Sequence, residues 1–410
     1  MLKKIFSTVV FCFLIVSCAS HKYEFKNFKY PEPVDTQNKP IKTICRKRYD
    51  LQGIYIDSRF DGARVNDARR INDTLVEIDI EPENYPINNS PWYAFKITSD
   101  SLQKIWIKLF YKSGHHRYFP KTSSDGQHWN PIDSSEVIMD TTGQTFMFSI
   151  KVKPSILWVA AQPVVNTEYV HRWILQIQKH SLVYDAKSIG KTVLKRDIPF
   201  FKIGINNGQK KKIILLFSRQ HPPEVTGFFA LQSFINELLH NDSLSERFYK
   251  DYEFWVFPLI NPDGVDLGHW RHNANGVDLN RDWAVFNQPE TLSVRNFSVS
   301  EANRTLQNVI LGIDFHSTFQ DIYYVNDQSD YTLSRNLIRF WTNSIDRSVA
   351  PFKTIYDASP IKKPVSKAWF YYQFGAAGVT YEVGDNVPVN LIDRKARAAA
   401  ISLMDLLLQK

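Results

Sequence analysis

The sequence predicts an antiparallel β-sandwich domain followed by an α/β domain with helices on both faces of its sheet. Short strand-like runs separated by turn signals fill residues 49–164, which is typical of a sandwich. From residue 165 to residue 410, strand-like and helix-like segments alternate, which favours an α/β sheet. The 410 residues are enough for two domains that each have a core of their own.

The strand-like runs of the first domain follow one another without a long helical period. The turn-forming sequences Asn-Asn-Ser-Pro at 88–91 and Ser-Ser-Asp-Gly at 123–126 interrupt them. The clearest runs lie at 75–80, 92–97, 104–111, 146–152 and 156–161.

The second domain has longer amphipathic segments between strands that look buried. We expect helices at 167–180, 225–241, 329–350 and 389–409. We expect strands at 211–218, 252–260, 311–315 and 378–384. In such a fold the catalytic residues lie at strand ends and in the adjoining loops.

The first residues predict an export signal. Lys3 and Lys4 precede a short apolar run that ends in Ile-Val-Ser-Cys at 15–18, and this run is too short to span a bilayer comfortably. The pattern is similar to a bacterial lipoprotein signal, which implies that residues 1–17 are cleaved and that Cys18 is acylated. An ordinary secretory signal and an uncleaved anchor are the alternatives.

Residues 18–48 are polar and carry three prolines, as a tether between a membrane and a domain would. We therefore expect a lipid-anchored protein of the cell envelope. Cys12 would leave with the signal and Cys18 would carry lipid, so Cys45 would have no disulfide partner within the chain. The formal charge of +8 fits acidic substrates, anionic lipid or solvated surface, and it discriminates weakly among them.

A histidine and a glutamate follow the expected strand at 211–218. His221 and Glu224 stand three residues apart in one turn, which the two prolines between them stiffen, so both can point at one ion. Zinc accepts this pair, and a third protein ligand leaves one coordination position open. His316, which ends the strand at 311–315, is the natural third ligand. A lone histidine at a strand end is more often a hydrogen-bonded structural residue, but the order of the parts along the chain favours the metal.

The segment 257–283, FPLINPDGVDLGHWRHNANGVDLNRDW, resembles the zinc metallocarboxypeptidase family (M14) of carboxypeptidase A. The resemblance covers residues 165–410 and implies a mixed-sheet α/β/α fold with one zinc ion. The Arg-Gln-His-Pro-Pro-Glu turn at 219–224 and the element 61–97 look most like the cytosolic carboxypeptidase branch. Members of that branch carry an N-terminal β-sandwich and remove glutamates from protein tails or side chains. Pro223 is a departure, because that branch commonly has glycine there.

The resemblance also implies roles for residues outside the metal site. Glu382, in Gly-Val-Thr-Tyr-Glu-Val-Gly, matches the general base that takes a proton from zinc-bound water. Arg271 matches the residue that helps to stabilise the oxyanion. Asn280 and Arg281 would bind the terminal carboxylate of the substrate, since the planar arginine head meets a carboxylate with two hydrogen bonds. Asp278 matches the residue that orients the first zinc histidine.

Three further residues are matched less directly. Tyr356, in Thr-Ile-Tyr-Asp-Ala-Ser, looks like the mobile tyrosine that closes over bound substrate, and a core tyrosine is the competing interpretation. Lys363 and Lys367 are the two places to which different alignments assign the residue that selects the substrate side chain. Either could pair with an acidic terminal residue, and solvated loop lysines are the alternative.

These expectations point to a zinc-dependent carboxypeptidase. Its substrate would be a peptide or an isopeptide branch, with an acidic terminal residue as the preferred one. The membrane would be a partner through the lipid anchor, and no nucleic acid is expected. One alternative is an amidase of peptidoglycan peptides. Another is a catalytically inactive protein that binds peptide or glycan, although such a protein should have lost a ligand, Arg271 or Glu382.

Overall fold

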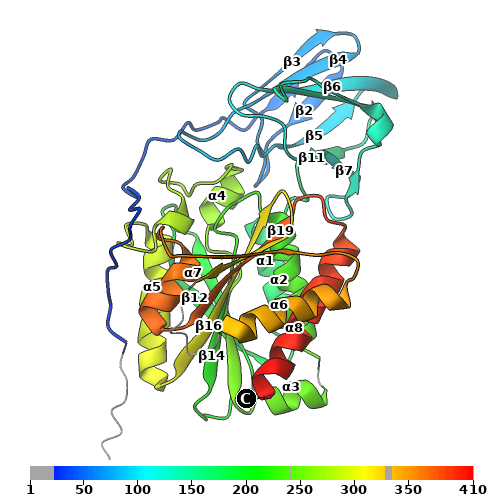
Figure 1. The fold of residues 1–410 in the computed structure, drawn as a ribbon. Helices are drawn as coiled ribbons and strands as arrows, with labels where there is room; N and C mark the ends of the chain where they lie inside the picture. The colour runs from blue at the N-terminus through cyan, green and yellow to red at the C-terminus, as the bar shows by residue number, and fades with distance from the viewer. Residues whose placement is uncertain (1–22, 241, 328–334, 410) are drawn as a thin grey trace, which may run out of the picture.

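The computed structural model describes residues 23–240, 242–327 and 335–409. Two small β-sheets sit together at one end of a larger α/β body (Figure 1). All the strands of the small sheets lie within residues 48–152 and 157–160, and all those of the large sheet lie within 183–384. The signal at 1–17 and Cys18 fall outside the described residues. Among the described residues, no helix combines the length and apolar character needed to cross a bilayer.

The two small sheets face each other as the sequence predicts. In the described residues the first sheet has the order β1 (Arg48–Asp50), β2 (Ile54–Asp57), β5 (Ala94–Ser99), β11 (Leu157–Ala160), β7 (Lys121–Ser123), β8 (Asn130–Pro131). The second has the order β3 (Asp67–Asn72), β4 (Leu75–Ile80), β6 (Gln103–Tyr111), β10 (Thr145–Val152), β9 (Val137–Met139). Along β6 every second residue from Ile105 to Tyr111 is buried, which is the period of a strand with one face on a core.

One strand pair departs from the expected antiparallel arrangement. β4 and β6 are parallel, with Leu75 opposite Trp106 and Ile80 opposite Tyr111. Between them the chain runs through β5, which belongs to the other sheet. This excursion lets β6 enter its sheet in the same direction as β4, because parallel neighbours need a crossover connection.

The large sheet is mixed. In the part of the chain described, its order is β12 (Val183–Lys191), β13 (Asp197–Ile203), β15 (Tyr252–Phe257), β14 (Lys212–Ser218), β16 (Asn308–Thr318), β19 (Ala377–Gly384), β17 (Ile322–Asn326), β18 (Ile355–Ser359). The central strands β15, β14, β16 and β19 are parallel to one another. Their residues are almost all buried, as expected of strands that are covered on both faces.

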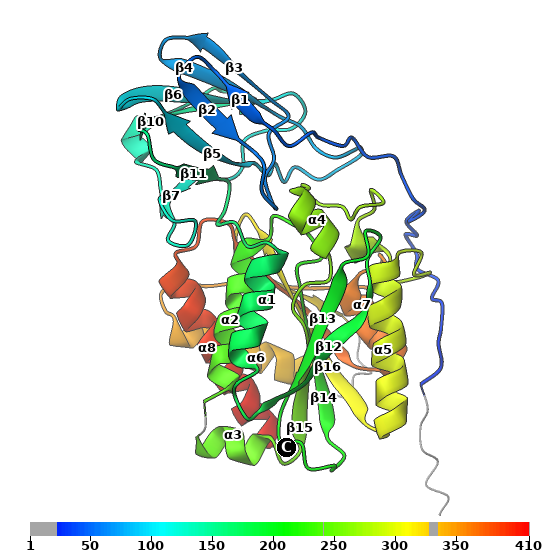
Figure 2. The ribbon, with the colours of Figure 1, turned by 180° about the vertical axis from the view of Figure 1, so that it is seen from behind.

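Helices cover both faces of the large sheet (Figure 2). On one side lie α1 (Thr167–Ile177), α2 (Val225–Leu238), α3 (Ser243–Phe248), α6 (Arg335–Ser348) and α8 (Val389–Leu408). On the other side lie α5 (Pro289–Thr305) and α7 (Ser366–Phe374), and the short α4 (Pro262–Leu267) lies next to the small sheets. Short 3₁₀ turns occupy Ser134–Glu136 and Leu279–Arg281. Because α4 directly follows β15 and lies next to the small sheets, the carboxyl ends of the parallel strands face the sandwich. The candidate site lies at these strand ends.

The segment from residue 23 to residue 47 contains neither helix nor strand and runs along the side of the α/β body (Figures 1 and 2). Its composition predicts a tether, but the structure adds specific anchors. The Thr36 hydroxyl is buried and donates to Asp282 Oδ1 over 2.5 Å. The Tyr30 hydroxyl donates to the Trp283 carbonyl over 3.2 Å. These contacts show that this segment packs on the second domain.

Candidate active site

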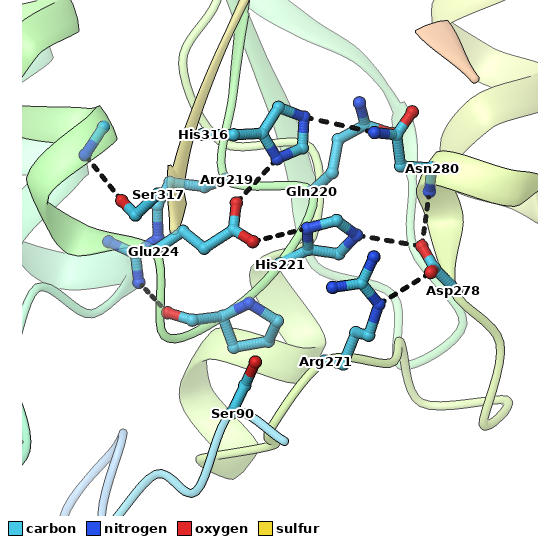
Figure 3. Close-up of polar contacts among 12 residues, drawn as sticks. Ser90, Arg219, Gln220, His221, Glu224, Arg271, Asp278, Asn280, His316 and Ser317 are labelled. Carbon is cyan, nitrogen blue, oxygen red and sulfur yellow. Dashed lines mark hydrogen bonds and ion pairs between the residues drawn. The ribbon is translucent and has the colours of Figure 1, made fainter. Parts of the chain in front are cut away.

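Three side chains converge beyond the ends of two central strands. His221 and Glu224 lie in the turn between β14 and α2, and His316 lies in β16, which is the neighbour of β14. The carboxylate of Glu224 stands between the two imidazoles (Figure 3): Oε1 lies 2.8 Å from His221 Nδ1 and Oε2 lies 2.6 Å from His316 Nδ1. One ligand atom from each of the three residues lies within 4.8 Å of the others. The structure thus brings together the three predicted metal ligands.

Each histidine also contacts a second carboxylate through its Nε2 atom. His221 Nε2 lies 2.9 Å from Asp278 Oδ1, and His316 Nε2 lies 2.8 Å from Asp314 Oδ2. An imidazole that donates from Nε2 to a carboxylate presents Nδ1 as an acceptor for an ion. Asp278 lies where the resemblance implies. Asp314 was not singled out from the sequence, although Asp-x-His in a strand places both side chains on one face.

The donor set fits zinc. Two imidazole nitrogens and one carboxylate oxygen are ligands that zinc takes in sites with an open fourth position. All three residues are buried, so little of their surface is exposed to solvent. Burial alone would raise the pKa of Glu224, but the two imidazoles and their hydrogen bonds outweigh burial and hold that pKa well below its usual value. A low carboxyl pKa suits a metal ligand, because a carboxylate must be deprotonated to bind the ion.

Glu382 lies beside the ligands on the next strand. β19 is parallel to β16, and Glu382 is the register partner of His316. Its Oε2 atom is buried and has no hydrogen-bond partner among the described residues. Burial raises the pKa of Glu382 to about 8, because it outweighs the lowering effect of the His316 charge. A divalent cation at the three ligands would favour the ionised carboxylate, because an opposite charge nearby lowers a carboxyl pKa.

The predicted clamp residues surround Asp278. Arg271 Nε donates to Asp278 Oδ2 over 2.7 Å, and the backbone N–H of Asn280 donates to Asp278 Oδ1 over 2.9 Å. Arg281 Nη1 donates to the Asn280 carbonyl over 2.8 Å. Burial would raise the pKa of Asp278, but the charges of Arg271, His221 and Arg281 keep it well below its usual value. One ionised carboxylate therefore positions a metal ligand and the residues expected to contact substrate.

A cavity of about 900 Å³ opens over these residues and reaches the β-sandwich. Its walls include Asn88, Asn89 and Arg117 from the sandwich. The charged residues that line it are mostly basic: Arg117, Arg271, Arg281, Lys362, Lys363 and Lys367 against Glu32, Glu224 and Glu382. The cavity therefore favours an anionic ligand.

The two candidate specificity lysines differ in their surroundings. Lys367 is partly buried at the start of α7, with Nζ 6.0 Å from the ring centre of Tyr324. Burial lowers the pKa of Lys367 to about 8, against the raising effect of Asp357. Lys363 is about half exposed, and its Nζ lies 3.6 Å from Glu32 Oε2. Both line the cavity, but only Lys367 lacks a carboxylate at ion-pair distance within the described residues.

Tyr356 is placed differently from the prediction. It lies in β18 opposite Tyr323 of β17, and its side chain packs against the hydrophobic core instead of lining the cavity. Successive side chains of a strand point to opposite faces. Tyr324, which follows Tyr323 in β17, therefore faces the cavity instead of the core. The competing interpretation of Tyr356 as a core tyrosine fits this position, and the role of closing over substrate stays a prediction.

Tyr324 and Arg117 are among the residues that line the cavity without having been predicted from the sequence. The Tyr-Tyr pair within 322–326 offered a signal for Tyr324, because alternation sends one ring inward and one outward. Nothing in the sequence indicated Arg117, which reaches the cavity from the other domain.

Comparisons with known proteins agree with this geometry. Residues 170–396, more than half of the chain, match the Peptidase_M14 family model, which is described as zinc carboxypeptidase. The chain is 22% identical to cytosolic carboxypeptidase 6 of Mus musculus over 286 residues, which cover 64% of this chain and 52% of that protein. It is 30% identical to cytosolic carboxypeptidase 6 of Caenorhabditis elegans over 234 residues, which cover 55% and 47%. The chain thus spans about half the length of these relatives.

Solved structures share the fold over a larger part of the chain. A metallo-carboxypeptidase from Burkholderia cenocepacia matches with a TM-score of 0.71 and 18% identity, covering 87% of this chain and 99% of that one. A metallo-carboxypeptidase from Pseudomonas aeruginosa matches with a TM-score of 0.69 and 18% identity, covering 86% and 99%. At these identities the likeness concerns the fold. Because the family model matches more than half of its residues, the chain belongs to the zinc carboxypeptidase family.

Proposed function

We propose that the protein is a zinc-dependent carboxypeptidase that hydrolyses the C-terminal amide bond of a peptide or of an isopeptide branch. The observation that carries this proposal is the convergence of His221, Glu224 and His316 beside Glu382, on a cavity that also holds the clamp residues. When bound at the three ligands, zinc supplies the Lewis acidity that polarises the scissile carbonyl and makes water a nucleophile near neutral pH.

The protein side chains have separate tasks in this reaction. Asn280 and Arg281 bind the terminal carboxylate and so place the last amide bond over the ligands. Glu382 accepts a proton from the attacking water while the oxygen of that water bonds to the carbonyl carbon. Arg271 stabilises the negative charge that develops on the carbonyl oxygen. As the carbon–nitrogen bond breaks, Glu382 transfers the proton to the departing amine nitrogen, which balances the hydrolysis.

We further propose a preference for acidic terminal residues, with Lys367 as the group that binds the side-chain carboxylate. The excess of basic residues around the cavity and the partly buried position of Lys367 support this. Lys363 contributes less, because it is more exposed and already faces Glu32. Lys367→Glu should therefore lower kcat/KM for peptides that end in Glu and raise it for peptides that end in Lys. Lys363→Glu is the matched control, and equal preference profiles in the wild type and in Lys367→Glu would dispose of this assignment.

The activity itself is tested with a diverse peptide mixture. The purified protein is incubated with the mixture, with and without a chelator, and mass spectrometry identifies the residues that are released. We expect stepwise loss of C-terminal residues that the chelator stops. Crosslinked peptidoglycan peptides form a second arm, and cleavage there without cleavage of ordinary peptides would favour the amidase alternative.

We also propose that the protein is a lipid-anchored protein of the cell envelope. The support is the signal-like pattern at 1–17 followed by Cys18. Cys18→Ser should move the expressed protein from the detergent-phase membrane fraction to the soluble fraction. A wild-type protein that carries no lipid by mass spectrometry would contradict the proposal.

A further inference from the structure

A buried carboxylate from the β-sandwich holds the backbone on which Arg271 stands. Glu83 follows β4 and is fully buried. Its Oε2 accepts the N–H of Trp270 over 2.7 Å. Its Oε1 accepts the N–H of Arg271 over 3.0 Å and that of His272 over 2.8 Å. One side chain of the sandwich thus satisfies three consecutive backbone donors, and Arg271 is the middle one.

The next residue of the sandwich fixes the far end of the same segment. Asn84 Oδ1 lies 2.6 Å from His272 Nδ1, and Asn84 Nδ2 donates to the Gly276 carbonyl over 3.0 Å. Gly276 has a φ of +70°, and a Cβ there would come within 2.4 Å of Asn84 Nδ2 and 2.7 Å of the Lys39 carbonyl. The close packing at Gly276 shows that Asn84 contacts this loop at a second place, beyond the backbone that Glu83 holds.

Glu83 remains ionised where the enzyme would work. Burial would raise its pKa, but the His269, Arg64 and His272 charges and the backbone hydrogen bonds lower that pKa to about 2. Burial lowers the pKa of His269, and it lowers that of His272 to about 4. Arg64 also donates to the Gly268 carbonyl over 3.3 Å, so it ties the other end of the loop to the sandwich.

The contacts continue from this loop to the metal ligands. From the backbone that Glu83 holds, the Arg271 side chain reaches the cavity and donates from Nε to Asp278 Oδ2. Asp278 Oδ1 in turn lies 2.9 Å from His221 Nε2 (Figure 3). A shift of the backbone at residues 270–272 would therefore move the guanidinium relative to the three ligands.

We propose that Glu83 is a positioning residue, through which the β-sandwich fixes the Arg271 guanidinium at the place where the oxyanion forms. The proposal rests on the proposed function, because Arg271 has this task only in a carboxypeptidase. Glu83 itself does not line the cavity. The role of the sandwich is therefore to complete the catalytic site as well as to shape its wall.

The test is Glu83→Gln in the full-length, zinc-loaded protein. Glutamine has nearly the same shape, but its NH₂ group can only donate, so at least one of the three backbone N–H groups loses its acceptor. Since hydrogen bonds to a charged group are among the stronger ones, we expect kcat to fall roughly 10–100-fold. KM should change far less, because Asn280 and Arg281 are not held by Glu83. Glu81→Gln is the matched control, since Glu81 faces Lys42 and Lys112 at the surface and should leave kcat unaltered.

Two further measurements separate positioning from simple stability. If Glu83 acts through Arg271, the double variant Glu83→Gln/Arg271→Ala should have the kcat of Arg271→Ala alone. Losses that multiply in the double variant would overturn the proposal. Hydrogen exchange of the amides at 270–272 should be faster in Glu83→Gln than in Glu81→Gln, and unaltered exchange would also overturn it. If Glu83→Gln does not fold, Glu83→Asp keeps the charge and withdraws the carboxylate, and the same criteria apply.

The proposed function fails in a different way. A zinc-loaded wild type that does not hydrolyse C-terminal amides would refute the carboxypeptidase assignment, whereas the exchange measurement would still report whether Glu83 holds the loop. Activity in the wild type with equal kcat in Glu83→Gln would refute only the positioning role.

Discussion

The ion pair between Arg117 and Asp385 gives a sharp prediction about stability. Arg117 Nε lies 2.8 Å from Asp385 Oδ2, and the two side chains are 7% and 3% exposed. Arg117 Nη1 also donates to the Asn89 carbonyl and to Ser90 Oγ, each over 3.0 Å. Arg117→Met removes the guanidinium and leaves a buried carboxylate without its counterion, which costs about 3–5 kcal/mol. At about 2–4 °C per kcal/mol, the unfolding midpoint should fall by roughly 6–20 °C.

The loss should depend on pH in a defined direction. Burial raises the pKa of Asp385 to about 6, although the Arg117 charge opposes this. A carboxyl with a raised pKa binds its proton more tightly in the folded state, so its destabilising effect is full above the folded pKa and fades as the pH falls through that value. Without Arg117 that pKa rises further. The difference in midpoint between Arg117→Met and the wild type should therefore be larger near pH 8 than near pH 5.

The assay is thermal unfolding followed by circular dichroism at the two pH values. Asp385→Asn serves as a control, and the double variant Arg117→Met/Asp385→Asn should recover most of the stability, because it buries no unpaired charge. The reasoning is refuted by a loss smaller than about 1 kcal/mol, which is the worth of an exposed pair. Equal losses at both pH values, or a double variant as unstable as Arg117→Met, would refute it as well.

Two other predictions concern the chemistry of the site. Glu382→Gln should lower kcat roughly 10²–10⁴-fold, which is the contribution of general acid–base catalysis. The bound zinc, measured by atomic absorption, should stay at the wild-type level, and loss of zinc in this variant would instead make Glu382 a ligand. Asp314→Asn should weaken zinc binding about 10–100-fold in a chelator competition, because the carboxylate behind His316 Nε2 is lost; unchanged affinity would show that Asp314 does not orient His316.

The metal centre could be predicted from the sequence because its parts are local. His221 and Glu224 share one turn. His316 and Glu382 each lie in a strand with a clear apolar pattern. These strands are neighbours in the sheet, so register alone brings His316 and Glu382 together. The order of the elements therefore carried most of the information that the geometry of the ligands required.

Other features depend on contacts that a linear pattern does not show. In the sequence nothing distinguishes Glu83 and Arg117 from other charged residues of the sandwich. Only the packing of the two domains brings Glu83 to Arg271 and Arg117 to Asp385. Helix α7 was not predicted, because its sequence Ser-Lys-Ala-Trp-Phe-Tyr-Tyr-Gln-Phe is aromatic on most sides and lacks a polar face. Tyr356 was assigned by its neighbours in the sequence, whereas the alternation of β18 decides which way its ring points.

The most direct measurement is the zinc content of the purified protein together with its activity. The account predicts one zinc ion per chain in the wild type, loss of most of it in His316→Ala, and release of C-terminal residues that stops on chelation and returns when zinc is added. A wild type that hydrolyses peptides without a bound divalent ion, or a His316→Ala variant that retains full zinc and activity, would contradict the claim that His221, Glu224 and His316 form the catalytic metal site.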